Sequence, residues 1–318
     1  MSHSCTPFAA AHPAPPFVRK DVDFDADRIT LRGWLYQPVE PAPHEQRHPL
    51  IVMSGGYGTT KEMFTDLFAE RFAGAGFMVL LYDHRGFGSS DGAPRREINP
   101  WQQIEDMRHA VTFASGLSEA DARRIGVWGS SYSGGHAIVL AATDRRVRCA
   151  VAQVPTVSGT QSALRRVNGE AEAQLLARLA DDRQQRARGS APRMLPIMGD
   201  AGSEAVYKTQ EAVDWYTAAY RRAPQQVPEV SLRSVEWSRA YNPGDYIQRV
   251  SPTPLLMVVA ERDTVTPTDL ALLAYNQALE PKALTLLPGS GHFDPYIKDF
   301  EIASTQALDW YRKHLGHR

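Results

Sequence analysis

A serine, a carboxylate and a histidine, three residue types that act together in acyl-transfer chemistry, follow three separate apolar segments of this chain. Ser131 is the centre of residues 129–134 (GSSYSG), between an apolar stretch ending at Trp128 and an apolar run beginning at Ala137. A serine among small residues, where a strand turns sharply into a helix, fits the nucleophile motif G-x-S-x-G, here with Ser133 at the last glycine position. Such a turn exposes one hydroxyl near a helix N-terminus, where negative charge is stabilised. The pattern predicts Ser131 as a nucleophile; the alternative is a tight Ser/Gly turn without chemistry.

A serine hydroxyl is a weak nucleophile until a base takes its proton and a carboxylate orients that base. His292 follows the apolar residues 283–287, and Asp263 follows the apolar residues 255–260. The order serine, acid, histidine is the one expected when each residue lies on a loop after a strand of an α/β sheet. Glu261 is the alternative acid, but the spacing from Asp263 to Pro267 leads into a helix start and favours Asp263.

Three other histidines compete for the role of base. His84 lies in a loop after a strand but precedes the serine, whereas His109 and His136 fall on predicted helices, where a structural role is expected. The sequence contains no His/Cys cluster with the spacing of metal ligands. We therefore predict an enzyme without a metal or other cofactor.

An acyl-enzyme reaction also needs donors for the developing oxyanion. The backbone N–H of Tyr132, directly after the serine, is the first candidate. The second lies in residues 54–61 (SGGYGTTK), where Tyr57 would donate through its N–H or its phenol. Glycines such as Gly56 let the backbone approach a substrate closely. The alternative is that these glycines only form a tight turn before a helix.

These residues need a scaffold, and the apolar segments provide one. Strands that are apolar throughout are buried on both faces, as in a parallel sheet covered by helices. Helices are predicted to begin near residues 61, 100, 131 and 267, with a terminal helix over 296–314. The fold class is therefore α/β, a mostly parallel, doubly wound sheet whose reactive loops meet beyond the carboxyl ends of the strands. The predicted strands are residues 18–24, 29–38, 50–53, 77–82, 124–130, 147–154, 255–260 and 283–287.

The alternation of strands and helices stops between residues 155 and 250. Leu175, Leu176 and Leu179 recur at helical spacing, as do apolar residues in 204–223, so we predict a helical cap over the carboxyl edge of the sheet. The core is then residues 17–154 and 251–318, and residues 1–16 form a disordered or extended N-terminus. A separate interaction domain is the alternative for the insertion. The residues predicted to bind an acyl group are Gly56, Trp215, Tyr216 and Trp237. For each of the three aromatic ones, packing of the cap against the core is the favoured role.

The composition is that of an ordinary globular protein. The 318 residues are 43% hydrophobic and 22% charged, with a net charge of −1, which gives no basis for nucleic-acid or anionic-membrane binding. A disulfide between Cys5 and Cys149 is not expected, and the first residues lack the pattern of a secretory signal. We expect a cytoplasmic protein acting on a small-molecule acyl substrate; the sequence leaves homodimerisation through the insertion open.

Together these motifs resemble the α/β-hydrolase superfamily. Residues 83–92 (DHRGFGSSDG) resemble the family's turn after its fourth strand, which is usually structural. Residues 129–134 also resemble the G-x-S-Y-x-G turn of the X-Pro dipeptidyl-peptidase and cocaine-esterase branch. In that branch a tyrosine hydroxyl helps to bind the oxyanion, a role that the resemblance gives to Tyr57. The loop around Tyr57 equally resembles the H-G-F-G turn of other members, with Gly55 in place of the histidine, and there the donor is the N–H alone.

The chain departs from full dipeptidyl-peptidases because no C-terminal jelly roll fits after the last core helix. It looks closer to single-domain relatives with a helical cap, which include esterases, thioesterases and polyketide acyl-transfer enzymes. The predicted function is a serine hydrolase that cleaves a carboxylic ester or thioester through an acyl-enzyme on Ser131. The alternatives are an acyltransferase or C–C bond hydrolase with the same triad, and a non-catalytic small-molecule receptor.

Overall fold

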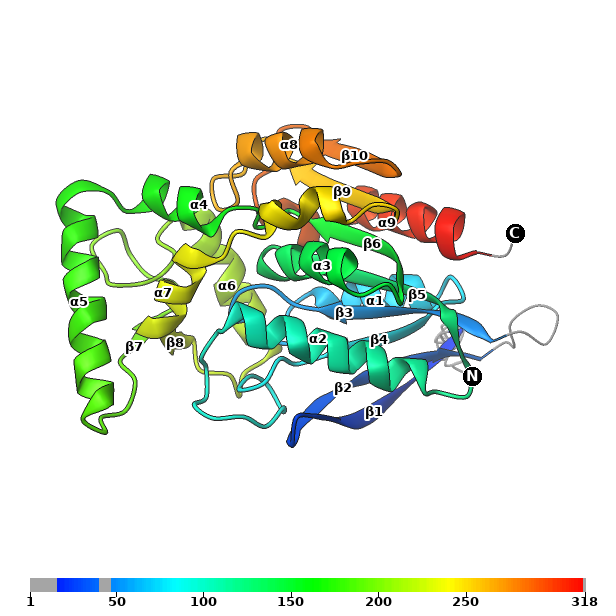
Figure 1. Ribbon diagram of the computed structural model, residues 1–318, viewed down its shortest axis with the longest axis horizontal. Helices are drawn as coiled ribbons and strands as arrows, with labels where there is room; N and C mark the ends of the chain where they lie inside the picture. Colours follow the sequence, from blue (N-terminus) through cyan, green and yellow to red (C-terminus); the bar gives the residue numbers. More distant parts are fainter. Residues whose placement is uncertain (1–15, 40–46, 317–318) are drawn as a thin grey trace, which may run out of the picture.

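The computed structural model describes residues 16–39 and 47–316, which form an eight-stranded sheet with helices on both faces and a cap at one end (Figure 1). The strand order is β1-β2-β4-β3-β5-β6-β9-β10. All neighbouring pairs from β4 to β10 are parallel, whereas β2 is antiparallel to both β1 and β4. The predicted α/β fold is confirmed. The strands are β1 (Phe17–Ala26), β2 (Ile29–Pro38), β3 (His48–Ser54), β4 (Met78–Tyr82), β5 (Ala120–Ser130), β6 (Val147–Gln153), β9 (Leu255–Ala260) and β10 (Lys282–Leu287).

Two hydrophobic layers flank the sheet because the central strands are apolar on both faces. In one layer, α1 (Thr65–Ala73) and α9 (Phe300–Leu315) pack Phe68, Phe72 and Tyr311 against the sheet. In the other, α2 (Pro100–Ser115), α3 (Tyr132–Thr143) and α8 (Thr268–Gln277) bury residues such as Met107 and Ile138. Strands β3, β4 and β9 are buried along their whole length, as predicted for a covered parallel sheet.

Some boundaries differ from the predictions. Helix α1 begins at Thr65 rather than near Lys61, and α9 begins at Phe300 because a short 3₁₀ helix (Asp294–Tyr296) precedes it. The structural prediction for residues 1–16 falls almost entirely outside the described residues, as does Cys5, while Cys149 is buried with a free thiol.

The chain leaves the sheet after β6 and returns to it at β9. The segment between them contains α4 (Gly159–Arg166), α5 (Gly169–Ala187), α6 (Gln210–Arg222), α7 (Leu232–Ala240), a 3₁₀ helix (Pro243–Arg249) and a hairpin of β7 (Met194–Pro196) and β8 (Glu229–Ser231). Figure 1 shows α5 standing at the outer edge of this region, beyond α4 and α7.

The insertion is mainly helical, but three details of it were not predicted correctly. The hairpin was not predicted. Helix α6 begins at Gln210 rather than near residue 204, since residues 204–209 are irregular and Tyr207 forms an isolated bridge with Met198. Leu175 and Leu179 are buried as expected, whereas Leu176 is exposed. Among residues 16–39 and 47–316, no helix combines the length and apolar character needed to cross a bilayer.

Candidate active site

Ser131 lies in a strained turn between β5 and α3. Its backbone has φ 57° and ψ −115°, a conformation that L-residues adopt rarely. The Ser131 N–H donates to the Gln153 carbonyl at 2.8 Å, and the Ser131 carbonyl accepts from the Thr156 N–H at 2.9 Å. A Cβ on Gly129 would lie 1.9 Å from the Ser133 carbonyl oxygen, so only glycine fits there. The small residues around Ser131 are thus required by the tightness of the turn.

The structure brings His292 and Asp263 to this serine from two other loops. His292 Nε2 lies 2.9 Å from Ser131 Oγ, and His292 Nδ1 lies 2.7 Å from Asp263 Oδ2. All three residues are buried, and Asp263 and His292 are nearly inaccessible. Because a carboxylate only accepts hydrogen bonds, Nδ1 carries the proton, which leaves Nε2 free to accept the serine proton.

The Asp263 carboxylate is held by further donors. The N–H groups of Val265 and Thr266 each donate to Oδ1 at 2.8 Å, and the Thr266 hydroxyl lies 2.8 Å from Oδ2. The same hydroxyl is 3.2 Å from His292 Nδ1. The carboxylate is therefore fixed in position before any substrate binds. Thr266 was not predicted as a site residue, although a hydroxyl residue three positions after the acid is a signal present in the sequence.

The alternative acid and bases lie elsewhere. The exposed Glu261 accepts from the Gly289 N–H at 2.6 Å and does not reach His292. His84 is buried beside Ser133, with Nε2 3.2 Å from Oγ, and His109 lies 3.4 Å from Asp27 at the surface. His136, on α3, contacts the hydroxyl of Tyr241 and the side chain of Gln103. Of the acids and bases considered, Asp263 and His292 are the pair in contact with each other, and His292 also contacts Ser131.

Sheet register places the predicted oxyanion loop beside the serine. Strands β3 and β5 are adjacent and parallel with Ser54 opposite Gly129, so the residues after each strand meet. A Cβ added to Gly56 would lie 3.1 Å from Ser131 Cβ. The Ser133 hydroxyl donates to the Gly55 carbonyl and ties the two loops together. In the described part of the chain, the N–H groups of Tyr57 and Tyr132 donate to no other acceptor, which leaves both available to a substrate oxygen.

A buried ion pair supports the same loop from behind. Asp83 is inaccessible, and its carboxylate accepts from the Lys61 ammonium at 2.6 Å, from the Lys61 N–H at 2.8 Å and from the Ser89 N–H at 3.1 Å. The ammonium also lies 2.9 Å from Glu62. Burial raises the pKa of the Asp83 carboxyl, while the charge of Lys61 opposes that rise. The loop that follows β4 is therefore structural, as the resemblance implied.

Comparison with known proteins agrees with this architecture. The family model for X-Pro dipeptidyl-peptidase (S15 family) matches residues 25–293. The chain belongs to this family. It is 33% identical over 299 residues to polyketide transferase grgF of a Penicillium species, covering 94% of this chain and 97% of the relative. It is also 31% identical to a thiohydrolase of Eupenicillium brefeldianum, covering 89% of this chain and 91% of that protein.

Solved structures show the same fold for this S15-family member. The crystal structure of the α/β-hydrolase GrgF from Penicillium superposes with a TM-score of 0.81 at 33% identity, covering 94% of this chain and all of the other. A hypothetical protein from Pseudomonas aeruginosa gives a TM-score of 0.82 at 27% identity, covering 99% of this chain and all of the other. The predicted membership of the α/β-hydrolase superfamily is confirmed.

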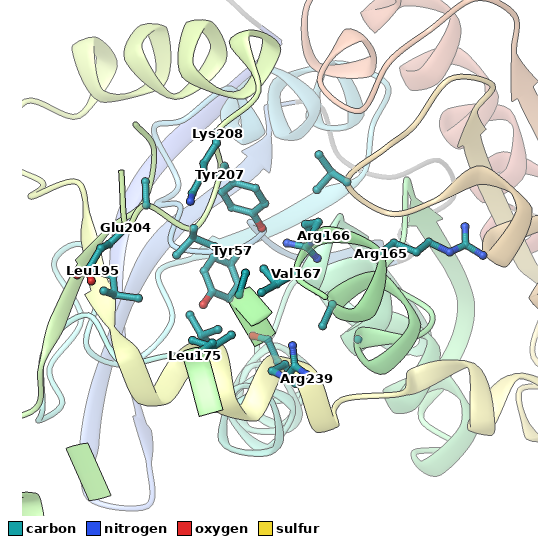
Figure 2. Close-up of a pocket in the computed structure, with 18 of the residues that line it drawn as sticks. Tyr57, Arg165, Arg166, Val167, Leu175, Leu195, Glu204, Tyr207, Lys208 and Arg239 are labelled. Carbon is teal, nitrogen blue, oxygen red and sulfur yellow. The ribbon is translucent and has the colours of Figure 1, made fainter. Parts of the chain in front are cut away.

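A pocket of about 1040 Å³ opens above Ser131, between the core loops and the cap. Ser131 and Tyr132 line it. Tyr57, Tyr207 and residues of α4, α5 and α7 also contribute to the lining (Figure 2). Its volume suits a medium-sized organic substrate. The sequence predicted only that the insertion covers the site. It did not indicate which residues of the insertion line the pocket.

The other residues predicted to bind substrate do not line this pocket. Trp215 is buried, stacks on Phe293 with ring centroids 4.9 Å apart, and joins the cap to the loop of His292. The Tyr216 hydroxyl donates to the Tyr57 carbonyl at 2.8 Å, and Trp237 lies under the guanidinium of Arg233. Trp215 and Tyr216 therefore pack the cap against the core, the role favoured for the aromatic residues, while the contact of Trp237 is with its own helix. Gly56 is also outside the lining, and it lies against Ser131.

Proposed function

We propose that this protein is a serine hydrolase that cleaves a carboxylic ester or thioester through an acyl-enzyme on Ser131. The observation that carries the proposal is the hydrogen-bonded series from Asp263 through His292 to Ser131, with the serine at the floor of a pocket. Three loops distant in sequence supply three residues whose chemistry is complementary.

In the first half of the reaction, Ser131 Oγ attacks the carbonyl carbon while His292 Nε2 takes its proton. The carboxylate of Asp263 stabilises the imidazolium that forms. The negative charge on the carbonyl oxygen is bound by the N–H groups of Tyr57 and Tyr132. His292 then returns its proton to the departing alcohol or thiol, and the acyl group stays on Ser131.

In the second half, His292 takes a proton from a water molecule, whose oxygen attacks the acyl carbon. The same two N–H groups bind the second oxyanion, and the acid is released when Ser131 recovers its proton from His292. Every step uses side chains and backbone groups of this chain, so the proposed mechanism requires no metal or cofactor.

Acyl transfer is the second candidate, because the names of the relatives include both a thiohydrolase and polyketide transferases. An alcohol or amine would then replace water in the second half-reaction. Hydrolysis of an activated carbon–carbon bond can use the same side chains. Product analysis with and without an added nucleophilic acceptor distinguishes acyl transfer from hydrolysis, since only transfer gives an acceptor-dependent product.

Labelling with a fluorophosphonate probe tests the proposal directly. The unmodified protein should be labelled and should hydrolyse p-nitrophenyl esters or acyl thioesters, and Ser131→Ala should abolish both. Ser130→Ala is the matched control, since Ser130 is the adjacent serine and its hydroxyl accepts from Gln153 Nε2 at 3.1 Å. Labelling that persists in Ser131→Ala would refute the assignment. A folded protein with neither labelling nor turnover would favour the receptor alternative.

A further inference from the structure

We propose that Arg166 binds an oxyanion carried by the substrate, a carboxylate or phosphate separate from the bond that is cleaved. The proposal rests on the proposed function, because it names the class of ester or thioester that the site accepts. It depends on how the charges of the pocket are paired.

The pocket wall is rich in cations, but most are neutralised. Arg165 forms a bidentate pair with Asp269 at 2.6 and 2.7 Å, and Arg178 pairs with Glu204 at 2.6 Å. Arg239 pairs with Glu172. The acidic partners Asp269 and Glu172 do not line the pocket themselves. These three arginines therefore have protein counterions and are not needed to explain substrate binding.

Arg166 differs from its neighbours. Within the described part of the chain it has no acidic side chain within ion-pair distance. Its Nε donates to the Ser162 carbonyl at 3.3 Å, and its guanidinium also hydrogen-bonds to the uncharged Tyr207 hydroxyl, so neither partner neutralises its charge. Lys208 is the other cation of the pocket that has no acidic partner among residues 16–39 and 47–316. Both are exposed, so water can solvate them while the pocket is empty. A substrate that fills the pocket displaces that water, and an unpaired guanidinium then needs an anionic partner.

The position of Arg166 directs its charge toward the catalytic end of the pocket. Its guanidinium lies 5.7 Å from the ring centroid of Tyr207, which in turn packs edge-on against Tyr57 at 5.9 Å. Burial raises the pKa of the Tyr57 phenol, and the charge of Arg166 opposes that rise. Figure 2 shows Arg166 extending toward Tyr207 and Tyr57, whereas Arg165 extends away from them.

An arginine at this place suits an oxyanion better than a neutral polar group. A guanidinium offers several donors in a planar fork, which matches the two oxygens of a carboxylate or phosphate. The aromatic wall of Tyr207 holds the fork at one side and limits its freedom. A substrate anion there would neutralise the unpaired charge and place the scissile carbonyl at a fixed distance from it.

Binding to a Ser131→Ala background tests the proposal without any need for turnover. Isothermal calorimetry would compare monomethyl adipate with dimethyl adipate, a pair that differs in one carboxylate on the acyl side. A second pair, 2-(pentanoyloxy)ethyl phosphate and 2-hydroxyethyl pentanoate, carries the anion on the alcohol side. We expect one pair to show about tenfold tighter binding of the anionic member, and that pair identifies the source of the oxyanion.

Further substitutions in the same background attribute the preference. Adding Arg166→Gln should reduce the preference to less than about twofold, whereas Arg166→Lys should keep part of it. Arg165→Gln is the matched control, since it removes an adjacent pocket arginine that already has a counterion, and should leave the preference intact. Lys208→Gln should reduce it less than Arg166→Gln does.

Equal binding of the charged and neutral members in both pairs would overturn the inference. So would a preference that survives Arg166→Gln. Neither result affects the proposed function, which depends on labelling and turnover by unmodified Ser131. Conversely, an inactive protein that still binds anionic esters through Arg166 would contradict the proposed function but not the anion site.

Discussion

The imidazole of His292 and the carboxylate of Asp263 are 2.7 Å apart at their closest atoms and almost completely shielded from water. The two residues lie on loops after adjacent strands, since β9 and β10 are paired with Ala260 opposite Leu287. Their contact follows from that register. It selects one tautomer of the imidazole, and the reactivity of Ser131 depends on that tautomer.

Asp263→Asn should lower kcat by about 10³- to 10⁴-fold. An asparagine amide can present an N–H to His292 Nδ1, which would favour the tautomer that cannot accept the serine proton. Ester hydrolysis at saturating substrate measures the effect. Glu261→Gln, on the same loop but directed at Gly289, is the control and should change kcat less than threefold; an equal loss in both variants would contradict the assignment of the acid.

Gly56→Ala should lower kcat by about a hundredfold, because its Cβ would press on Ser131 and displace the adjoining Tyr57 N–H from the oxyanion. Tyr57→Phe should cost less than tenfold if the N–H is the donor. Kinetics of both variants, with circular dichroism to verify folding, decide between the two modes of donation. A loss in Tyr57→Phe as large as that in Gly56→Ala would assign the role to the phenol.

Stability should fall as the pH decreases below about 6.5, in part because of His84. Burial lowers the pKa of this imidazole to about 3. Between that value and the unfolded pKa near 6.5 the unfolded chain binds more protons than the folded one, so each lower pH unit costs about 1.4 kcal/mol. Urea denaturation at pH 7 and pH 5 should show a smaller difference in His84→Gln than in the unmodified protein.

His109→Gln provides the control for this measurement, because His109 lies on the outer face of α2 near Asp27. That variant should retain the full dependence on pH. Burial also lowers the pKa of His136, so part of the dependence should remain in His84→Gln. A pH dependence identical in all three proteins would show that His84 does not contribute.

Lys61→Met should destabilise the fold by about 3–5 kcal/mol, because it leaves the carboxylate of Asp83 buried without its cation. Adding Asp83→Asn to Lys61→Met should recover part of the loss, since the second change removes the unpaired charge. Denaturant midpoints of the single and double variants measure both effects. If the double variant is less stable than Lys61→Met, the destabilisation has another cause.

The strands, and the three residues proposed to react, could be recognised in the sequence because both depend on local patterns. Apolar runs such as residues 255–260 have few alternatives to a buried strand, and the chain order of Ser131, Asp263 and His292 fits the carboxyl edge of a parallel sheet. Glu261 could not be excluded by pattern alone. Only the structure shows that its carboxylate accepts from Gly289 while Asp263 faces the histidine.

The cap was predicted less well, because its contacts are made between segments far apart in sequence. Nothing near Trp215 in the chain indicates that it stacks on Phe293 instead of facing the pocket. Arg165 and Arg166 are adjacent and chemically identical. Among the residues that the structure describes, Arg165 meets a carboxylate, from Asp269 more than a hundred residues away, whereas Arg166 meets none. Short elements such as β7 and β8 also give too little periodicity to be recognised.

The reacting groups lie on the sheet loops, whereas much of the pocket wall belongs to the insertion. This separation affects how the scaffold can diversify. The three residues proposed to react, Ser131, His292 and Asp263, all lie on loops that follow parallel strands, while much of the pocket wall comes from the segment that joins β6 to β9. Replacing side chains of α4, α5 or α7 would change the shape of the pocket, and therefore the substrates that fit it, without moving the reacting groups. Proteins descended from one ancestral chain can therefore change their substrate specificity while they keep the same chemical step.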